Sequence, residues 1–343
     1  MREGILKRQG INSMKREKLL ITGGAGFIGS TFVKEVLQDG FTLPVVVDKL
    51  TYAGDLLRLQ AVKGRYVFYK ADIIDKQSLR SVFKKEKPHA VVHFAAESHV
   101  DRSIRDASTF IETNVRGTQV LADVAREYNV KRFIHISTDE VYGEIRKGGF
   151  PESHPLCPSS PYSAAKAAAD LLVISYIRTH GFPAIIVRPS NIYGPWQYPE
   201  KLVPWAVLCL LKKQKIPVYG RGQNIREWLF VGDCVAGILD ILKRGRAGEI
   251  YNLGSGEERK NMEVVQAILT QAHKGRSWIV FVKDRQGHDI RYRMDSRKIR
   301  KELGWKPSLD FEKGLKATVE WCLDNREWLL RKWRYIAPFY HRE

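Results

Sequence analysis

Cysteine is scarce in this sequence of 343 residues. The four cysteines are Cys157, Cys209, Cys234 and Cys322, which are widely separated and form no C-x-x-C pair. This spacing excludes the usual zinc clips and dithiol redox centres. A chain with so few cysteines suits a reducing compartment, so we expect a cytoplasmic protein without a metal site.

Long apolar runs are also missing. No stretch approaches the roughly 18 apolar residues that a membrane-spanning helix needs. The first 18 residues are basic and lack the apolar core of a signal peptide. The sequence therefore predicts no membrane partner.

Acidic residues are outnumbered, with 38 Asp and Glu against 57 Lys and Arg, a formal net charge of +19. Such a charge can bind nucleic-acid phosphates. Here the basic residues are interspersed with acids, and no zinc-finger, RNP or basic-stripe pattern organises them, so we expect no nucleic-acid partner. A positive field also speeds the encounter with a small diphosphate-bearing substrate, although a Lys/Arg-rich surface alone is an equal alternative.

Short apolar runs alternate with helical stretches from residue 18 onward, which is typical of a doubly wound α/β fold with a parallel sheet. The predicted strands of the sheet are bounded by turn signals and lie at residues 19–22, 45–47, 66–69, 90–94, 133–137 and 185–187. Helices are expected over 103–128 and 162–179. After these come a helix over 204–213 and a short strand over 217–219.

After Gly194 and Pro195 the predicted helices and strands become shorter. We predict a disordered extension at 1–13, an NAD-binding Rossmann domain over 14–194 and mainly a smaller substrate-binding lobe over 195–335. Residues 229–255 are expected to return in part to the first domain.

A glycine-rich segment marks the predicted cofactor site. Gly23, Gly26 and Gly29 stand three apart between the first strand and the following helix. Glycines permit the tight turn and let backbone N–H groups approach a pyrophosphate, which the helix N-terminus stabilises. Asp48, at the end of the second strand, is suited to bind both hydroxyls of an adenosine ribose and to repel a 2′-phosphate. The sequence thus predicts NAD rather than NADP, and a turn needed only for packing is the weaker alternative.

Tyr162 and Lys166 stand four apart at the start of a predicted helix, so their side chains share one face. A neighbouring ammonium and the positive ring of a bound cofactor would lower the pKa of a phenol, which would let Tyr162 act as a base toward a hydroxyl. On its own such a pair is common on solvated helix faces. The glycine turn and Asp48 favour the catalytic interpretation.

The triplet Thr138, Asp139 and Glu140 follows the fifth predicted strand, at the sheet edge where ligands of such folds bind. Two carboxyl groups in different environments can divide the work of an acid and a base. A solvated acid pair or a helix N-cap is the alternative. Simple dehydrogenation needs no such pair, whereas elimination of water does.

With these residues assembled, the chain is similar to the extended short-chain dehydrogenase/reductase superfamily and, within it, resembles the dTDP-glucose 4,6-dehydratases. The similarity runs from about residue 18 to about residue 328. The glycine turn and the Tyr/Lys pair mark the superfamily, and the Thr-Asp-Glu triplet marks the dehydratases. Further family runs are DKLTYAG at 48–54, AAESHVDRS at 95–103, YPEKL at 198–202 and DRQGHD at 284–289.

The resemblance implies conversion of dTDP-glucose to dTDP-4-keto-6-deoxyglucose by oxidation at C4, loss of water across C5 and C6, and hydride return to C6. Tyr162, next to Lys166, would deprotonate the C4 hydroxyl, while Thr138 hydrogen-bonds its oxygen. Glu140 would take the C5 proton and Asp139 would protonate the departing C6 hydroxyl. The resemblance also implies a homodimer built from the helices near 103–128 and 162–179.

Binding residues are carried over in the same way. The cofactor would contact Gly23, Gly26, Phe27, Ile28, Gly29, Asp48, Lys49, Leu50, Thr51, Asp72, Ile73, Phe94, Ala95, Ala96, Glu97, Ser98, Thr113, Tyr162, Lys166 and Ile192. The nucleotide sugar would contact Ser98, Thr138, Asn191, Lys201, Leu202, Pro217, Val218, Tyr219, Arg226, Asn261, Asp284, Arg285, Gln286, Gly287 and His288. The chain departs from the family pattern at Ile192, usually Asn, at Glu227, usually Asp, and at Gln286, usually Pro.

Four other functions compete with this interpretation. A UDP-glucose 4,6-dehydratase shares most of these marks, and Gln286 lies in the predicted nucleotide-binding segment. A nucleotide-sugar 4-epimerase does not need the acid pair, and a UDP-glucuronate decarboxylase would normally have Ser before the Glu. A non-catalytic dinucleotide binder has no need to keep the acid pair together with Tyr162 and Lys166.

Overall fold

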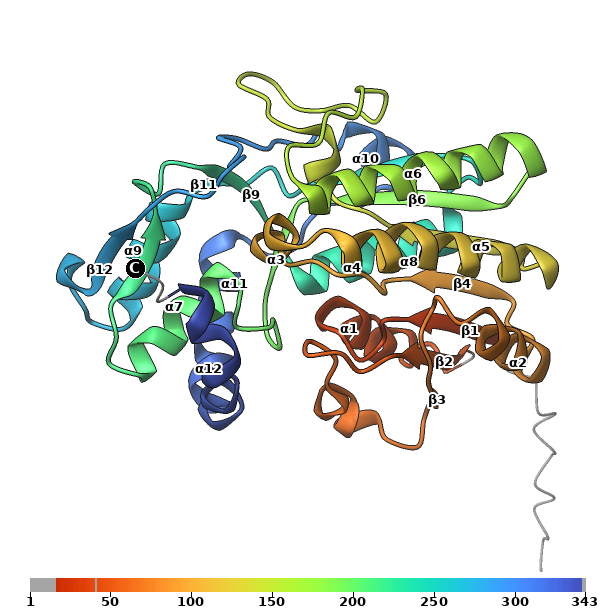
Figure 1. Cartoon of the computed structure of the whole chain (residues 1–343), viewed down its shortest axis with the longest axis horizontal. Coiled ribbons are helices and arrows are strands. Elements are labelled where there is room, and N and C mark those ends of the chain that lie inside the picture. The colour runs from red at the N-terminus through yellow and green to blue at the C-terminus, as the bar shows by residue number, and fades with distance from the viewer. Residues whose placement is uncertain (1–16, 41, 341–343) are drawn as a thin grey trace, which may run out of the picture.

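A computed structural model describes residues 17–40 and 42–340 of the chain. The predicted extension at 1–13 lies outside the described residues. Figure 1 shows a layered body, in which helices cover a sheet, beside a smaller group of helices and short strands. Within the described part of the chain, no helix has both the length and the apolar character needed to cross a membrane.

The large sheet has seven strands in the order β10-β6-β5-β4-β1-β2-β3, and every neighbouring pair is parallel. Its strands are β1 (Glu17–Thr22), β2 (Thr42–Asp48), β3 (Val67–Lys70), β4 (Ala90–His93), β5 (Arg132–Ile136), β6 (Ala184–Pro189) and β10 (Ile250–Leu253). The predicted doubly wound parallel sheet is confirmed, because strand order reverses between β1 and β4 and helices lie on both faces.

Successive residues of β1 point to opposite faces of this sheet. Ile21 packs into one apolar core with residues of α1 (Phe27–Val36), α8 (Val231–Arg244) and α10 (Arg297–Leu303). Leu20 packs into another with α2 (Lys76–Glu86), α5 (Gly117–Glu127) and α6 (Pro161–His180). Figure 1 shows α5 and α6 running along one face of the sheet. The near-continuous apolar strands predicted from the sequence therefore reflect burial on both sides.

The single helix predicted over 103–128 is wrong. The chain forms α3 (Val100–Arg105), the short α4 (Ser108–Phe110), the π-helical segment η2 (Ile111–Arg116) and then α5. Asp106 interrupts the helical pattern because its backbone is extended, with φ −150° and ψ 113°. Its carboxylate accepts a hydrogen bond of 2.9 Å from the N–H of Ser108, the first residue of α4.

The smaller lobe has its own apolar core and two small sheets. A three-stranded sheet contains β7 (Asn191–Tyr193), β9 (Ile225–Phe230) and β11 (Glu258–Lys260), and a two-stranded sheet pairs β8 (Ile216–Tyr219) with β12 (Ile279–Val282). The helices of this core are α7 (Leu202–Leu211), α9 (Asn261–Gln271), α11 (Phe311–Asp324) and α12 (Arg326–Tyr340). The chain also contains three short 3₁₀ helices among the described residues: η1 (Leu56–Val62), η3 (Asp139–Tyr142) and η4 (Arg276–Trp278).

Candidate active site

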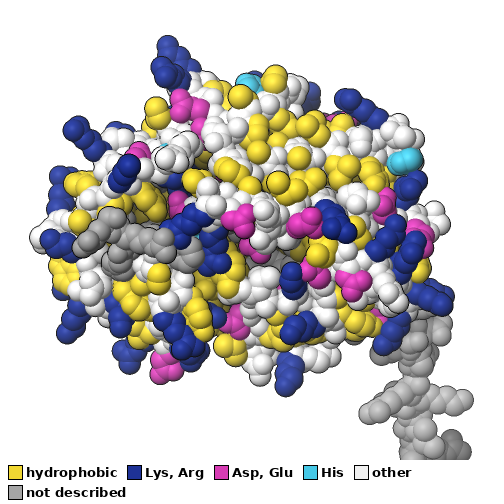
Figure 2. All heavy atoms as spheres, in the orientation of Figure 1, with side chains coloured by type: hydrophobic (Ala, Val, Ile, Leu, Met, Phe, Trp, Pro, Cys, Tyr) yellow, Lys and Arg dark blue, Asp and Glu magenta, His cyan; other side chains and the backbone are white. Residues whose placement is uncertain are grey.

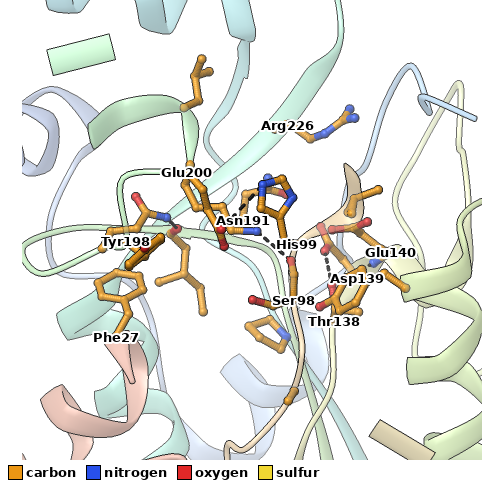
Figure 3. A pocket seen from close by; sticks show the side chains of 18 of the residues that line it. Phe27, Ser98, His99, Thr138, Asp139, Glu140, Asn191, Tyr198, Glu200 and Arg226 are labelled. Atoms are coloured by element: carbon orange, nitrogen blue, oxygen red, sulfur yellow. Dashed lines mark hydrogen bonds and ion pairs between the residues drawn. The ribbon is translucent and has the colours of Figure 1, made fainter. Parts of the chain in front are cut away.

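A cavity of about 410 Å³ lies where the carboxyl ends of the central strands meet the smaller lobe. Its size and position match those of ligand sites in open α/β sheets. The predicted site residues that line it are Gly23, Gly26, Phe27, Ile28, Gly29, Phe94, Ala96, Ser98, Thr138, Asp139, Glu140, Tyr162, Lys166, Asn191, Ile192, Lys201, Leu202, Pro217, Val218, Tyr219, Arg226, Asn261, Arg285, Gly287 and His288. Figure 3 shows the acid pair and Thr138 gathered on one side of this cavity, with Phe27 and Tyr198 on the other.

The glycine turn before α1 is too close-packed for side chains. Gly23 has φ +68°, and a Cβ on it would lie 2.6 Å from the backbone nitrogen of Ala95. A Cβ on Gly29 would lie 2.3 Å from the carbonyl oxygen of Gly23. No side chain caps the N-terminus of α1 at Gly26. The uncapped N–H groups at the cavity wall fit the pyrophosphate of a dinucleotide.

Asp48 ties the end of β2 to this turn. Its carboxylate accepts hydrogen bonds from the N–H of Ala25 at 2.9 Å and of Leu50 at 2.8 Å. Burial raises the pKa of Asp48, and the two N–H donors oppose that rise. Beside it, the Nζ of Lys49 lies 2.5 Å from Oδ2 of Asp72. The strand-end carboxylate thus lies next to the glycine turn, as an acceptor for a ribose requires.

Some predicted binding residues do not line the cavity. They are Asp48, Lys49, Leu50, Thr51, Asp72, Ile73, Ala95, Glu97, Thr113, Asp284 and Gln286. Several have partners within the protein instead. The N–H of Glu97 donates to Oδ1 of Asn114 at 2.8 Å, and Oδ1 of Asp284 lies 2.7 Å from Nδ1 of His288.

The helix α6 begins where the sequence supplies a capping box. Ser160 caps the helix and exchanges hydrogen bonds with Ser163, and Pro161 occupies the first turn. Tyr162 is therefore held in the first turn, where its N–H donates to Oγ of Ser103 at 3.1 Å. Its side chain is 8% exposed and faces the cavity.

Burial dominates the electrostatic setting of the Tyr/Lys pair in the protein alone. The Nζ of Lys166 donates to the carbonyl oxygen of Ile136 at 2.7 Å, and burial lowers the pKa of Lys166 to about 8. Burial, reinforced by the negative charge of Glu140, raises the pKa of Tyr162. The predicted lowering of the phenol pKa depends on the positive ring of a bound cofactor as well as on the ammonium, so it stays a prediction; in the protein alone desolvation dominates.

The acid pair lies on η3, directly after β5. Thr138 caps this turn: its hydroxyl accepts from the N–H of Glu140 at 3.3 Å and donates to Oδ1 of Asp139 at 3.1 Å. Asp139 is 2% exposed, and burial together with the charge of Glu140 raises its pKa well above the usual range. Burial also raises the pKa of Glu140, but Lys201, Arg226 and Arg285 oppose that rise. The two carboxyl groups therefore have different environments, which suits an acid beside a base.

The lobe side of the cavity is basic. Arg226 on β9 stacks over the ring of Tyr292, with its guanidinium carbon 4.2 Å from the ring centre, and its Nη2 donates to the carbonyl of Asp289 at 2.9 Å. Lys201 donates to the carbonyl of Ser98 at 2.8 Å. Together with Arg285 these cations form a wall suited to a diphosphate.

Several lining residues had no predicted role. Glu200 is 5% exposed, and burial raises its pKa to about 7; the hydroxyl of Tyr52 donates to its Oε1 at 3.2 Å. His99 lies with Nε2 3.6 Å from Oε2 of Glu200, and burial lowers its pKa to about 2. Glu200 lies in the family run YPEKL at 198–202 and His99 in the run AAESHVDRS at 95–103, so the family resemblance could have indicated both residues. Arg58 also lines the cavity, where Nη1 donates to the carbonyl of Ala25 at 3.0 Å, and nothing local in its sequence indicated burial.

Comparisons with known proteins find 4,6-dehydratases by sequence, and both dehydratases and epimerases by structure. The sequence model of the GDP-mannose 4,6 dehydratase family matches residues 20–318. A dTDP-glucose 4,6-dehydratase of Streptomyces niveus is 47% identical over 320 residues, which cover 91% of this chain and 94% of that protein. A crystal structure of the dTDP-glucose 4,6-dehydratase of Streptomyces venezuelae with NAD bound matches with a TM-score of 0.89 and 47% identity, covering 91% of this chain and 98% of that one. The UDP-glucose 4-epimerase of Thermotoga maritima matches with a TM-score of 0.84 and 30% identity, covering 90% of this chain and 99% of that one.

Proposed function

Because the chain belongs to the dTDP-glucose 4,6-dehydratase family of extended short-chain dehydrogenases/reductases, we propose that it converts dTDP-glucose to dTDP-4-keto-6-deoxyglucose. The observation that carries this proposal is the pairing of a buried Asp139 with Glu140 in one cavity with Tyr162. Elimination of water from the hexose needs an acid and a base at neighbouring carbons, and this pair supplies both.

NAD is the cofactor that the glycine turn and Asp48 fit. The uncapped start of α1 would hold the pyrophosphate, and Asp48 would accept hydrogen bonds from the adenosine ribose. When bound, NAD would take up a hydride from C4 of the hexose and return it to C6. The carboxylate of Asp48 disfavours NADP, because it would repel a 2′-phosphate.

Tyr162 would accept the proton of the C4 hydroxyl. Its hydroxyl group lines the cavity beside Thr138, whose own hydroxyl would hydrogen-bond the C4 oxygen and orient it. Because burial raises the pKa of Tyr162, the phenolate needs positive charge nearby. Lys166, one turn along the same helix, would supply part of it, and the positive nicotinamide ring of the bound cofactor would add to it.

Glu140 and Asp139 would carry out the elimination. Once C4 is a ketone, the C5 proton is acidic, and Glu140 would remove it as a carboxylate favoured by the surrounding cations. Asp139, kept protonated by burial, would give its proton to the C6 hydroxyl, which leaves as water. As hydride reaches C6, Glu140 would return the proton to C5. The proton that Tyr162 takes from the C4 hydroxyl balances the one that Asp139 gives to the water, so the reaction needs no external acid or base.

The diphosphate would lie against Lys201, Arg226 and Arg285. These three side chains line the cavity from the lobe side, and each carries a charge that pairs with phosphate oxygens. Gln286 stands where the family usually has Pro, so UDP-glucose is the alternative substrate.

We also propose that two copies of the chain pair through α5 and α6. Figure 2 shows apolar side chains gathered over this face, where Leu171 on α6 is 58% exposed and Ile111 at the start of η2 is 53% exposed. Leu171→Lys should convert a dimer to a monomer in light scattering. Leu323→Lys is the matched control, because Leu323 is 50% exposed on α11, away from this face. A wild-type monomer would refute the pairing. We also propose a cytoplasmic location, which the small number of cysteines supports.

One assay tests the proposed function. The purified protein is incubated with dTDP-glucose and, separately, with UDP-glucose, without added reductant. The mass of each product is measured by mass spectrometry. Loss of one water molecule from dTDP-glucose, faster than from UDP-glucose, is the expected result. A preference for UDP-glucose would reassign the nucleotide, and a product of unchanged mass that is a sugar epimer would contradict the dehydratase.

A further inference from the structure

A buried charge cluster lies behind the cavity, on the side of α6 that faces the sheet. Asp170 stands on α6 one turn after Lys166, and it is 0% exposed. Its Oδ2 accepts a hydrogen bond of 2.8 Å from Nε of Arg188 on β6, which is also buried. Its Oδ1 lies 3.4 Å from Nε2 of His135 on β5. Asp170 does not line the cavity, so it cannot touch a ligand there.

The cluster connects α6 to the short helix that carries the acid pair. Nη1 of Arg188 donates to the hydroxyl of Tyr142 at 2.7 Å, and Tyr142 is the last residue of η3. The hydroxyl of Tyr142 then donates to Oδ1 of Asn252 on β10 at 2.9 Å. A continuous series of hydrogen bonds thus runs from Asp170 to the helix of the acid pair. Such a series restricts how far the two helices can move relative to each other.

Lys166 is held by the residue next to this cluster. Its Nζ donates to the carbonyl of Ile136, which follows His135 on β5. A carbonyl fixes the position of an ammonium but carries no net charge to balance it. Burial favours the neutral amine and lowers the pKa of Lys166, whereas the negative charge of Asp170 raises it.

We propose that Asp170 is a positioning residue that acts through Lys166: held by Arg188 and His135, it keeps the buried ammonium of Lys166 charged and in place at the cavity wall. The inference rests on the proposed function, because the reaction uses the charge of Lys166. Burial lowers the pKa of His135 to about 4 and also lowers the pKa of His93 on β4, and an imidazole carries no negative charge in either protonation state, so neither replaces a carboxylate.

Other charged groups around α6 belong to two sets. On the sheet and cavity side they are His93, His135, Asp139, Glu140, Tyr142, Tyr162 and Arg188. On the helices α3, η2 and α5, which also pack on α6, they are Asp101, Arg102, Arg105, Glu112, Arg116, Asp123, Arg126 and Glu127. Burial, and not a neighbouring cation, is the main cause of the lowered pKa of Lys166.

Asp170→Asn tests the proposal, because the amide keeps the shape and the oxygen acceptor for Arg188 but removes the charge. The pH at which kcat falls on the basic side should move down by about one unit, since an adjacent opposite charge shifts a pKa by about 1–3 units. KM for dTDP-glucose should stay unchanged. Asp170→Glu keeps the charge and should restore the wild-type profile.

Asp233→Asn is the matched control. Asp233 on α8 is 5% exposed and accepts hydrogen bonds from the N–H and hydroxyl of Ser308 and from the N–H of Leu309. It does not line the cavity. If loss of a buried carboxylate has only a structural effect, Asp170→Asn and Asp233→Asn should both be less stable than wild type. Only Asp170→Asn removes the charge beside Lys166, so only this variant should shift the pH profile of kcat.

A second measurement does not depend on turnover. Cyanate carbamoylates amines only in the neutral form, and Lys166 is reachable because it lines the cavity. Mass mapping of the Lys166 peptide, on the full chain labelled over a pH series, gives the midpoint of its reactivity. That midpoint should move down by about one unit in Asp170→Asn and stay in place in Asp233→Asn.

If Asp170→Asn does not fold, the double variant Asp170→Asn/Arg188→Gln replaces it, because neither charge is then left buried alone. The same downward shift is expected. A folded variant with an unshifted kcat profile and an unshifted labelling midpoint would overturn the role of Asp170. A wild-type protein that fails to dehydrate dTDP-glucose would overturn the proposed function instead, and the labelling midpoints would still decide the role of Asp170.

Discussion

Arg285 binds Asp101 through two hydrogen bonds, Nε to Oδ1 at 2.7 Å and Nη2 to Oδ2 at 2.9 Å. Asp101 lies on α3, on the side of the large sheet, whereas Arg285 comes from the segment after β12 in the smaller lobe. The pair therefore joins the two walls of the cavity. It also holds the guanidinium beside the ring of Tyr219, with its central carbon 5.2 Å from the ring centre.

If Arg285 contacts the substrate diphosphate, Arg285→Met should raise KM for dTDP-glucose about 10- to 100-fold, because a charge-assisted hydrogen bond contributes about 1.5–3 kcal/mol. The contact is equal in the ground and transition states, so kcat should change little. Arg244→Met is the control, since Arg244 pairs with Asp240 on the surface of α8. Steady-state kinetics with an unchanged KM in the Arg285 variant would remove this residue from the binding site.

Glu140→Gln should separate oxidation from elimination. The amide keeps the shape but cannot accept the C5 proton, so product formation should fall about 10²–10⁴-fold. Absorbance in the reduced-nicotinamide band should then rise and persist in a single turnover. Tyr162→Phe should instead suppress that rise, because the C4 hydroxyl keeps its proton. Normal product formation by Glu140→Gln would mean that another group takes the C5 proton.

Asp139→Asn should make the protein more stable at alkaline pH. The pKa of Asp139 is raised in the folded state, so the folded protein binds more protons than the unfolded one above the usual aspartate range. The free energy of unfolding then falls as pH rises from about 4 through the folded pKa. Asparagine removes this loss, so the Tm of the variant should exceed that of wild type at pH 8, and the gap should narrow toward pH 4. An equal or lower Tm at pH 8 would show that Asp139 is not kept protonated by its surroundings.

Asp48→Ala should weaken NAD binding about tenfold or more, because it removes the proposed ribose acceptor and two hydrogen bonds to the glycine turn. The measurement is the NAD content of the purified protein and its titration by calorimetry. Asp240→Ala, a surface change on α8, should leave NAD binding intact. Full cofactor occupancy in the Asp48 variant would place the ribose elsewhere.

Much of the fold could be predicted from local pattern. The strand ends at Thr22 and Ile136 were predicted within one residue because apolar runs stop there at turn signals. The helix of Tyr162 could be predicted from its apolar periodicity, and the capping box that starts it shows why it begins there. The break in the helix at Asp106 could not be predicted, because Asp106 fits a helical period equally well and only the structure shows its extended backbone.

The parts of the site that escaped prediction depend on contacts between distant segments. Arg58 is buried only because carbonyls from three separate turns converge on it, among them that of Trp196 at 3.1 Å. The pKa of Tyr162 depends on its desolvation, which the spacing to Lys166 does not report. Asp170 carries no local signal of its role, because Arg188 and His135, which lie beside it, come from other segments of the chain. Chemistry-bearing motifs are local, whereas the residues that tune them are not.

The fate of a single deuterium tests the central claim most directly. dTDP-glucose labelled with deuterium at C4 is incubated with the purified protein, and the product is analysed by mass spectrometry and NMR. A 4,6-dehydratase should release a 4-keto-6-deoxy sugar that is one water molecule lighter and carries the deuterium on C6. A product of unchanged mass with the deuterium still on C4 would contradict the account, because the acid pair at Asp139 and Glu140 would then have no elimination to perform.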